Sequence, residues 1–536
     1  MLPAAVTGPP SPPIAERTVG DLLRRAVTLQ PDRAALVEGA SRPGDRRRWT
    51  YRELLADAEA CARALLAIAE PGNRIAVWAP NIPEYQVLQY GIALAGMVMV
   101  TVNPAFRAPE VRYAVDNAEV AVLFAAARYR DRELTETAHS LLGQAPQLLH
   151  VISFADFARF LASADPSRRL PDVDPAETAQ ILFTSGTTGQ PKGAMLSHRA
   201  MTNNVAHAAE IIKAGPVEHP TWLASLPMFH LASCVVAAMG TAFLAGTLVT
   251  VEQFDARLVL RLIEEERITM MNQVPTLVMA MLSHPDAHVR DLTSLHSVML
   301  GGATIPPELV RELHARLGTV SLIGYGMTEA AHITITRAHD TPEDKAGTCG
   351  LPLPHVEVRI RDPRTGEDLS PGEVGEVVTR GFHVMRGYYR NPAATSSAID
   401  EQGWLHTGDL GSLDERGYLQ IRGRLGDMII RGGENVYPRE IEERLQQWPG
   451  IEEAAVVGLP DDYYGEIVAA FVRLGPAAGP LDVPKVTASL REDLTGYKIP
   501  AKWFVVGDFP RTPSGKIRKF EIRDTWGRGD YVEERS

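Results

Sequence analysis

The sequence predicts an α/β protein. Its large N-terminal domain would hold two doubly wound α/β subdomains and a small β-barrel-like part, followed by a small α+β C-terminal domain. Three observations support this. The length of 536 residues suggests three or four packing units at roughly 150 residues each. A pattern of strand, buried helix and strand occurs twice in the first half. From about residue 345, short alternating runs separated by Gly and Asp turns replace that pattern, as in antiparallel hairpins.

The composition predicts a folded protein without a polyanionic partner. Hydrophobic residues make up 45% and charged residues 22% of the chain, which is ordinary globular usage. The formal charge of −12 opposes binding to nucleic acid or anionic membranes, so any anionic ligand must be held locally. The cysteines, Cys61, Cys234 and Cys349, are spaced neither as a zinc site nor as a disulfide framework. We therefore expect a cytoplasmic protein.

The first segment, residues 1–17, reads MLPAAVTGPPSPPIAER. It lacks the basic start and long apolar core of a signal peptide, and its prolines oppose a targeting helix. We expect a disordered tail here.

Two stretches without charge, Tyr85 to Phe106 and Leu231 to Val251, are about as long as a membrane span. Each breaks at a glycine into a helix-like half and a β-branched half, and each follows a strand-like run, RIAVWAPNIP or TWLASLPMFH. Because Ser, Thr and Gly interrupt both stretches and no basic cluster flanks them, we favour buried helices over membrane spans. The chain is not expected to be an integral membrane protein.

Further strands are expected at AVLFAA, LLHVISF, AQILFTS, TMMNQV, SVMLGGA and SLIGYG, which fit parallel sheets buried on both faces. Later strands are expected at VEVRI, GEVGEVVTRG and GYLQIRGR. A compact unit follows, with a helix at PREIEERLQQ, strands at AAVVGLP and EIVAAFVRL, and a helix near VTASLREDL. We place a domain boundary near Arg424.

A loop directly after one strand carries the first chemical signal. It consists of Thr184, Ser185, Gly186, Thr187, Thr188, Gly189, Gln190, Pro191, Lys192 and Gly193. Small hydroxyl residues and glycines let backbone N–H groups approach a phosphate, and Lys192 adds a positive charge. The loop is not a P-loop, because Pro191 stands before the lysine. It predicts a phosphate site.

These ten residues resemble the signature of the adenylate-forming superfamily, which includes acyl-CoA synthetases, nonribosomal adenylation domains and firefly luciferases. The resemblance extends from about residue 18 to 525. Other motifs occur in the family's order: PMFH at 227–230, GGA at 301–303, YGMTE at 325–329, TGD at 407–409, GRLGD at 423–427, GGENVYP at 432–438 and PSGK at 513–516. The chain looks most like fatty and medium-chain acyl-CoA synthetases.

The resemblance implies a two-step reaction. A carboxylate attacks the α-phosphate of ATP to give acyl-AMP and pyrophosphate, and coenzyme A then displaces AMP. Negative charge builds in both steps, so cations and hydrogen-bond donors are needed. The implied catalytic residues are Lys516, Glu329, Thr184 and His230, and Glu329 with Thr184 would hold Mg²⁺. The implied ligand-binding residues are Thr184 to Gly189, Lys192, Gly301, Gly302, Ala303, Tyr325, Gly326, Met327, Thr328, Asp409, Arg424, Gly432, Gly433 and Lys516.

Individual roles follow from the same resemblance. Lys516 would contact the carboxylate and α-phosphate, Tyr325 would offer its ring to adenine, and Asp409 would accept hydrogen bonds from both ribose hydroxyls. Gly301, Gly302 and Ala303 would form the opposite wall of the adenine site. Arg424 would add a ribose or phosphate contact.

The acyl pocket is expected from the helix after His230, from Asn272 to Thr276, and from Met327 with Ala330 and Ala331. No acidic residue occurs between Met228 and Val251. An amino-acid-activating domain would place an aspartate there, so an apolar acid fits better than an α-amino acid.

Rotation of the small domain is also implied, because one face cannot present both Lys516 and a thiol channel. We expect an N-terminal adenylate-forming domain over 18–423, a hinge over 424–427 and a mobile C-terminal domain over 428–536. The family pivots on Asp or Lys where this chain has Gly426, which absorbs large φ/ψ changes but lacks a side chain to steady each orientation. Gly432 and Gly433 could border the pantetheine arm.

The expected activity is an AMP-forming acyl-CoA synthetase for a medium or longer fatty acid. The expected partners are a carboxylic acid, ATP, Mg²⁺ and coenzyme A, and a homodimer is a possible assembly. One alternative is a ligase that loads the same adenylate onto a carrier protein. Another is a non-catalytic nucleotide-binding regulator, which the presence of Lys516, Glu329 and Asp409 together disfavours.

Overall fold

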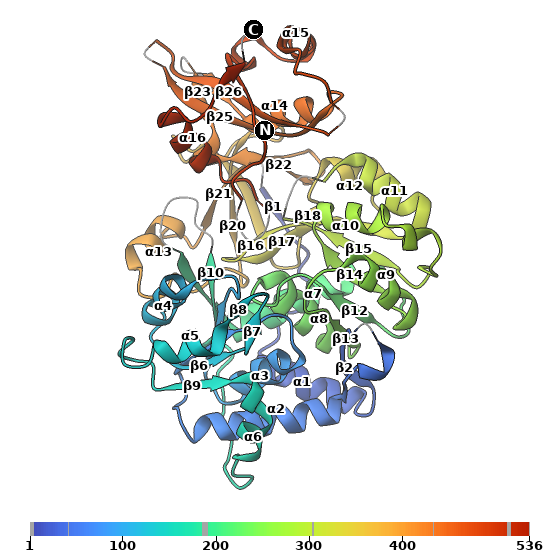
Figure 1. Cartoon of the computed structure of the whole chain (residues 1–536), viewed down its shortest axis with the longest axis vertical. Coiled ribbons are helices and arrows are strands. Elements are labelled where there is room, and N and C mark those ends of the chain that lie inside the picture. The colour runs from blue at the N-terminus through green and yellow to red at the C-terminus, as the bar shows by residue number, and fades with distance from the viewer. Residues whose placement is uncertain are drawn as a thin grey trace.

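The computed structural model describes residues 5–40, 42–184, 191–302, 305–431, 434–461, 463–476, 478–511 and 516–534. Within these ranges the strands form four sheets of five or more strands and one two-stranded sheet. Figure 1 shows a small C-terminal domain, in orange and red, above a larger body that holds the rest of the chain. The predicted mixed α/β class, with a large N-terminal and a smaller C-terminal domain, is confirmed.

The first large sheet has six strands in the order β11-β10-β5-β4-β6-β9, parallel except for the pair β10–β11. Its strands are β4 (Arg74–Trp78), β5 (Val98–Val102), β6 (Val120–Ala125), β9 (His150–Ser153), β10 (Thr178–Thr184) and β11 (Lys192–Ser197). The accompanying elements are α2 (Tyr51–Leu66), α3 (Pro83–Leu94), α4 (Ala108–Asn117), α5 (Leu134–Ser140), η2 (Phe154–Asp156), α6 (Phe157–Ala162) and the hairpin β7 (Arg128–Tyr129) with β8 (Arg132–Glu133).

Helix α3 explains the first uncharged stretch. Every residue of this helix except Glu84 is buried. Pro83 stands at its first position, which suits a fixed φ, and Gly96 follows its end at φ +64° and turns the chain into β5. The predicted unit of strand, buried helix and strand is therefore β4–α3–β5.

The second large sheet has nine strands in the order β18-β17-β16-β15-β14-β12-β13-β2-β3. Its strands are β2 (Ala34–Glu38), β3 (Arg48–Thr50), β12 (Thr221–Ala224), β13 (Thr247–Thr250), β14 (Met270–Gln273), β15 (Ser297–Leu300), β16 (Val320–Met327), β17 (Ala331–Ile335) and β18 (Leu351–Pro352). The accompanying elements are α1 (Val19–Leu29), η1 (Pro43–Asp45), α7 (His198–Ile212), η3 (Ala232–Ala237), α8 (Ala238–Phe243), α9 (Ala256–Glu265), α10 (Pro275–Leu282), η4 (Pro285–His288), α11 (Pro307–Leu317) and α12 (Pro342–Gly347).

The second uncharged stretch is also a buried helix between two parallel strands, β12 and β13. It differs from α3 in one respect. Its first part, η3, is a π-helix, and only the following α8 has ordinary α-helical hydrogen bonding. No helix in the described part of the chain is long and apolar enough to cross a membrane.

The predicted antiparallel part is a five-stranded sheet in the order β1-β19-β20-β21-β22. Its elements are β1 (Ala5–Thr7), β19 (Glu357–Arg361), β20 (Gly375–Arg380), α13 (Pro392–Ala398), β21 (Leu405–Leu413) and β22 (Leu419–Arg424). The prediction of a disordered tail over 1–17 is wrong for residues 5–17. Strand β1 pairs with β19, and the Gly8 N–H donates to the Val356 carbonyl at 2.8 Å. Residues 1–4 lie outside the described ranges.

The C-terminal domain follows the short helix η5 (Leu425–Asp427). It contains β23 (Ile429–Arg431), β24 (Glu434–Val436), α14 (Pro438–Gln446), β25 (Ile451–Asp461), β26 (Gly465–Leu474), α15 (Val483–Asp493), η6 (Gly496–Lys498), β27 (Lys502–Val505), α16 (Lys519–Gly527) and β28 (Glu533–Glu534). Two hydrophobic clusters fill it, and all their buried residues lie between Ile429 and Ile522. The buried residues of the other two clusters all precede residue 420.

Candidate active site

The predicted phosphate loop connects two paired strands. Thr184 is the last residue of β10, and Lys192, the first residue of β11, stands opposite it. The Lys192 ammonium lies 5.1 Å from the centre of the Tyr388 ring, within range of a cation–π interaction. Ser185, Gly186, Thr187, Thr188 and Gly189 lie outside the described residues. The structure therefore places the two ends of this loop, Thr184 and Lys192, opposite each other on paired strands.

The glycines after β15 occupy positions that disfavour a side chain. A Cβ atom on Gly301 would lie 3.2 Å from the Gly324 carbonyl oxygen, and Gly302 has φ +77°. Both restrictions explain why a side chain is absent where the sequence suggests a wall for a flat base. Ala303, the third residue of this motif, lies outside the described residues.

Tyr325, Asp409 and Arg424 form one connected group. The Tyr325 hydroxyl donates to Asp409 Oδ2 at 2.7 Å, and Arg424 Nε pairs with Asp409 Oδ1 at 2.7 Å. The pKa of Tyr325 lies well above its usual value, because burial and the neighbouring carboxylate both disfavour the phenolate. A carboxylate has about four lone-pair positions, so Asp409 can still accept bonds from two ribose hydroxyls.

Glu329 follows β16 in the segment Gly326, Met327, Thr328, Glu329. A side chain on Gly326 would clash with the Ala331 carbonyl, which explains the glycine. Glu329 is only 7% exposed, and its Oε1 accepts a hydrogen bond from the Tyr388 hydroxyl at 2.7 Å. The described residues contain no cluster of three or more His, Cys, Asp or Glu able to hold a metal. A single carboxylate suits Mg²⁺, which keeps several waters and binds substrate phosphates.

Lys516 comes from the C-terminal domain and faces this group. Its pKa is lowered, first because atoms crowd around its ammonium and second because of the like charge of Arg424; Asp409 and Glu329 act in the opposite direction. The four charged side chains are therefore close enough to influence one another. This orientation of the small domain brings Lys516 to the site. Pro513, Ser514 and Gly515 of its motif lie outside the described residues, as do Gly432 and Gly433.

His230 lies in the turn just before the π-helix. Burial and the positive charge of Lys516 lower its pKa to about 4, so it is neutral at pH 7. The turn before it is held by Asn81, which follows β4. Asn81 accepts from the Met228 N–H at 2.7 Å and donates to the carbonyls of Leu226 and Val251 at 2.8 and 3.0 Å. One turn of the first α/β unit thus supports the corresponding turn of the second.

Sequence reasoning missed two residues of this site, Tyr388 and Asn81. Tyr388 lies between Lys192 and Glu329 and contacts both, but the segment Met385–Arg390 matches no quoted motif. Asn81 had a weak signal, since it sits in the turn that precedes an uncharged helix, as His230 does. Of the expected acyl-pocket residues, Asn272 donates from Nδ2 to the Ala232 carbonyl at 3.0 Å and so ties β14 to the π-helix.

The models of the AMP-binding enzyme family and of its C-terminal domain match residues 23–389 and 440–516. A feruloyl-CoA synthase of an Amycolatopsis species is 36% identical over 89% of this chain and 94% of its own length. The mitochondrial medium-chain acyl-CoA ligase ACSF2 of Danio rerio is 33% identical over 97% and 90% of the two chains.

Solved structures match this chain over nearly its whole length. The ATP-bound structure of MatB from Rhodopseudomonas palustris has a TM-score of 0.86 and 30% identity, and the match covers 95% of this chain and 99% of that one. ATP, coenzyme A and typically Mg²⁺ are the cosubstrates and cofactor that these relatives imply. Such relatives favour coenzyme A over a carrier protein, and an enzyme over a regulator. The chain belongs to the AMP-binding enzyme family and is an adenylate-forming acyl-CoA ligase.

Proposed function

We propose that the acid activated by this ligase is an aliphatic acid of medium or longer chain. The observation that carries the proposal is the run from Met228 to Val251, which contains no Asp, Glu, Lys or Arg. In this run, η3 and α8 place small side chains, including Ser233, Ala237 and Ala238, in a buried environment beyond His230. An acyl chain would meet apolar surface there and no partner for an ammonium group.

A panel of acids tests this proposal. ATP–pyrophosphate exchange and thioester formation would be measured with acetate, octanoate, decanoate, ferulate and an α-amino acid. Each buried CH₂ contributes about 0.8 kcal/mol, or roughly fourfold, so octanoate and decanoate should have kcat/KM values far above that of acetate. Ferulate is included because one relative is named for it. The highest kcat/KM for acetate or the amino acid would overturn the proposal.

We propose that adenylation, the first step, is catalysed by the charged side chains that lie near Lys516. On this proposal Lys516 stabilises the negative charge that develops between the acid and the α-phosphate, with Thr184 and Lys192 bordering the phosphates. Asp409 and Arg424 orient the ribose. Adenine lies between the ring of Tyr325 and the opposite wall of Gly301, Gly302 and Ala303. The proximity of Lys516 to Arg424, Asp409 and Glu329 supports this assignment. Mg²⁺, held by Glu329 with Thr184, would neutralise charge on the phosphates.

For the second step we propose that residues 428–536 rotate relative to residues 18–423 about a hinge at 424–427. The separation of the hydrophobic clusters before residue 420 and after residue 428 supports these limits. His230 is neutral, so it can donate or accept a hydrogen bond next to the reacting carbonyl without adding charge. Gly432 and Gly433 would then border the pantetheine arm.

We also propose that the enzyme works in the cytoplasm, in the form of a homodimer. All three cysteines are free thiols, and two of them, Cys61 and Cys234, are buried, which suits a reducing compartment. Cell fractionation would test the location, and sedimentation equilibrium would test the assembly.

A further inference from the structure

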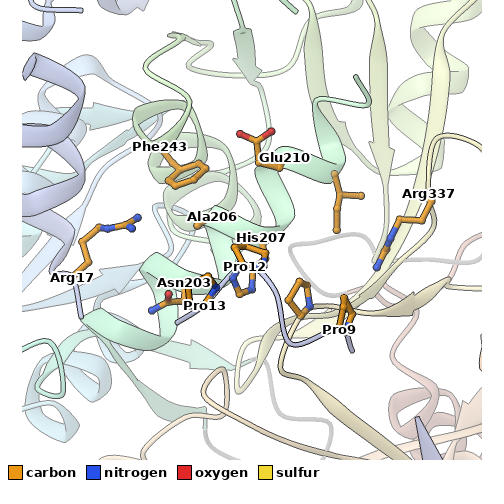
Figure 2. A pocket seen from close by; sticks show the side chains of 12 residues that line it. Pro9, Pro12, Pro13, Arg17, Asn203, Ala206, His207, Glu210, Phe243 and Arg337 are labelled. Carbon is orange, nitrogen blue, oxygen red and sulfur yellow. The ribbon is translucent and has the colours of Figure 1, made fainter. Parts of the chain in front are cut away.

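A cavity of about 440 Å³ lies between the N-terminal segment and helix α7. Figure 2 shows its lining: prolines of the segment, side chains of α7, Phe243 from the end of α8, and an arginine on each side. None of the lining residues belongs to the active site described above. The volume is within the range of 300–1,000 Å³ that is usual for small-molecule sites.

The wall formed by the N-terminal segment is held at three points. Asn203 of α7 accepts from the Ala15 N–H at 2.8 Å and donates to the Ala15 carbonyl at 2.9 Å. The His355 ring bonds to the Pro12 carbonyl at 2.8 Å, and the Gly8 N–H bonds to the Val356 carbonyl. The cavity is therefore a built feature of the fold.

The apolar part of the lining consists mainly of rigid groups. Pro9, Pro12 and Pro13 form one side, and Ala206 and Phe243 contribute to the other (Figure 2). Proline rings lose little conformational entropy when a ligand covers them. Such a lining suits a compact apolar body.

The charged part of the lining favours an anion. The guanidinium group of Arg17 points toward the middle of the cavity in Figure 2, and that of Arg337 lies on the opposite side, where it donates to the carbonyls of Ile335 and Pro352 and contributes its positive charge. Arg17 Nη1 is buried and has no hydrogen-bond partner among the described residues. The one acidic residue in the lining, Glu210, pairs with Lys213 at 2.7 Å, has a 53% exposed side chain, and turns its carboxylate away from the prolines.

His207 adds a hydrogen-bonding group without adding charge. It is 4% exposed, and its Nδ1 has no partner within the described part of the chain. Burial, followed by the neighbouring His355, lowers its pKa to about 4, so the ring is neutral at pH 7. The ring N–H donates to the Pro354 carbonyl, so the neutral Nδ1 is an acceptor, which can take a hydrogen bond from a donor group of a ligand but not from its anionic group.

We propose that this cavity is a second ligand site, separate from the active site, that takes a small apolar molecule with one carboxylate or sulfonate group. The anionic group would bind Arg17, with Arg337 opposite, and the apolar body would lie on the prolines and Phe243. The site is independent of which acid the enzyme activates.

The probe for this site is 8-anilinonaphthalene-1-sulfonate, which fluoresces on burial and has no carboxylate to activate. N-phenyl-1-naphthylamine, which has the same apolar body without the sulfonate, is the matched neutral probe. Titrations would be done with the active site saturated by a non-hydrolysable acyl-adenylate analogue. We expect one sulfonate molecule to bind per chain, more tightly than the neutral probe.

Three variants locate the probe. Arg17→Gln should weaken sulfonate binding about tenfold and leave the neutral probe unaffected, because a hydrogen bond to a charged group is lost. Arg24→Gln removes an equal charge from α1 at an exposed position and should change neither probe. Ala206→Met keeps Arg17 but fills the cavity and should weaken both probes, which preserves the test if Arg17→Gln fails to fold.

Several results would overturn the proposal. Displacement of the sulfonate by the adenylate analogue would place the probe in the active site. Equal losses for Arg17→Gln and Arg24→Gln, or unchanged binding to Ala206→Met, would place it elsewhere on the surface.

Discussion

The two domains contribute to the active site in different ways. In the large domain the polar groups are already bonded to one another: Tyr325 to Asp409, Asp409 to Arg424 and Tyr388 to Glu329. The small domain contributes Lys516, which follows the proposed hinge in the sequence and whose pKa responds to Arg424, Asp409 and Glu329. The difference indicates that the large-domain wall is preformed and serves both half-reactions, whereas the position of Lys516 depends on the orientation of its domain.

Within the proposed hinge, Gly426 itself has few contacts that would resist rotation. No heavy atom of the described residues lies within 4 Å of where a Cβ of Gly426 would be, so a side chain would fit there. Arg523 of α16 approaches the Gly426 carbonyl at 3.5 Å and the Asp427 carboxylate at 3.7 Å. Both contacts are long, so they hold this turn only weakly.

Of the substitutions considered, Gly426→Pro should change the ratio of the two half-reaction rates most. Proline fixes φ near −65°, which suits the short helix η5, and should hold the small domain in the orientation that presents Lys516. We expect pyrophosphate exchange to continue and thioester formation to fall by at least about a hundredfold, a barrier increase of about 2.7 kcal/mol. Stopped-flow assays of each half-reaction would measure this. Gly426→Ala, which adds no clash, should run both steps normally.

A Gly426→Pro enzyme that ran both steps at wild-type rates would move the pivot to another residue between Arg424 and Asp427. Circular dichroism and thermal unfolding would establish that the variant is folded.

Lys516→Ala should separate the half-reactions in the opposite direction. Loss of a preorganised charge worth roughly 3 kcal/mol should slow adenylation about a hundredfold. Synthetic acyl-AMP with coenzyme A should still give thioester at a near-normal rate, because Lys516 has then rotated away. Lys502→Ala, which removes an ion pair with Glu533 in the same domain, is the control and should change neither step. Equal losses in both assays would mean that Lys516 serves binding or folding.

Asp409→Ala should affect both half-reactions together. It leaves the Tyr325 hydroxyl and the Arg424 guanidinium without their bonds and removes the expected ribose acceptor. Loss of charge-assisted hydrogen bonds of about 1.5–3 kcal/mol corresponds to a drop of about 10- to 100-fold in kcat/KM for ATP and for acyl-AMP. Asp409→Asn should fall between this variant and the wild type. A loss confined to one step would show that the large-domain wall is not shared.

Tyr388→Phe should have the smallest effect. It removes the hydroxyl that donates to Glu329 at 2.7 Å but keeps the ring beside Lys192. We expect about a fivefold rise in the Mg²⁺ concentration for half-maximal exchange, since one hydrogen bond contributes about 1 kcal/mol. Tyr389→Phe is a close control, because its hydroxyl bonds to Glu119, outside the site. Equal effects of the two variants would contradict a role of Tyr388 in positioning Glu329.

The parts of the fold that follow from local pattern could be predicted from the sequence. The units β4–α3–β5 and β12–η3–α8–β13 could be predicted because each contains an uncharged helical run, a glycine and then a β-branched run. Strand β1 could not be predicted. Its three residues are too few to show a hydrophobic periodicity, and its partner strand is distant in sequence. The π-helix of η3 was also missed, because its apolar pattern matches that of an ordinary helix.

The site residues also fall into those that the sequence motifs predicted and those that only the folded structure reveals. Residues within quoted motifs, such as Tyr325, Asp409 and Arg424, were named in advance, but their mutual bonds depend on β16, β21 and β22 meeting in space. Tyr388 could not be found, because its importance comes from lying between two residues that are far from it in sequence. A tyrosine after a glycine has no local feature that distinguishes a site residue from a core residue.

Strand β1 has a consequence for how the protein is made. It ends at Thr7, and its partner β19 begins at Glu357, so about 350 residues must be translated before the pair can form. At about 5–20 residues per second, the ribosome needs on the order of 20 to 70 seconds for that length. The N-terminal segment must therefore wait, unpaired, while the two large sheets behind it are synthesised. It joins the molecule as one of the last pieces of the large domain, although it is made well before its partner strand.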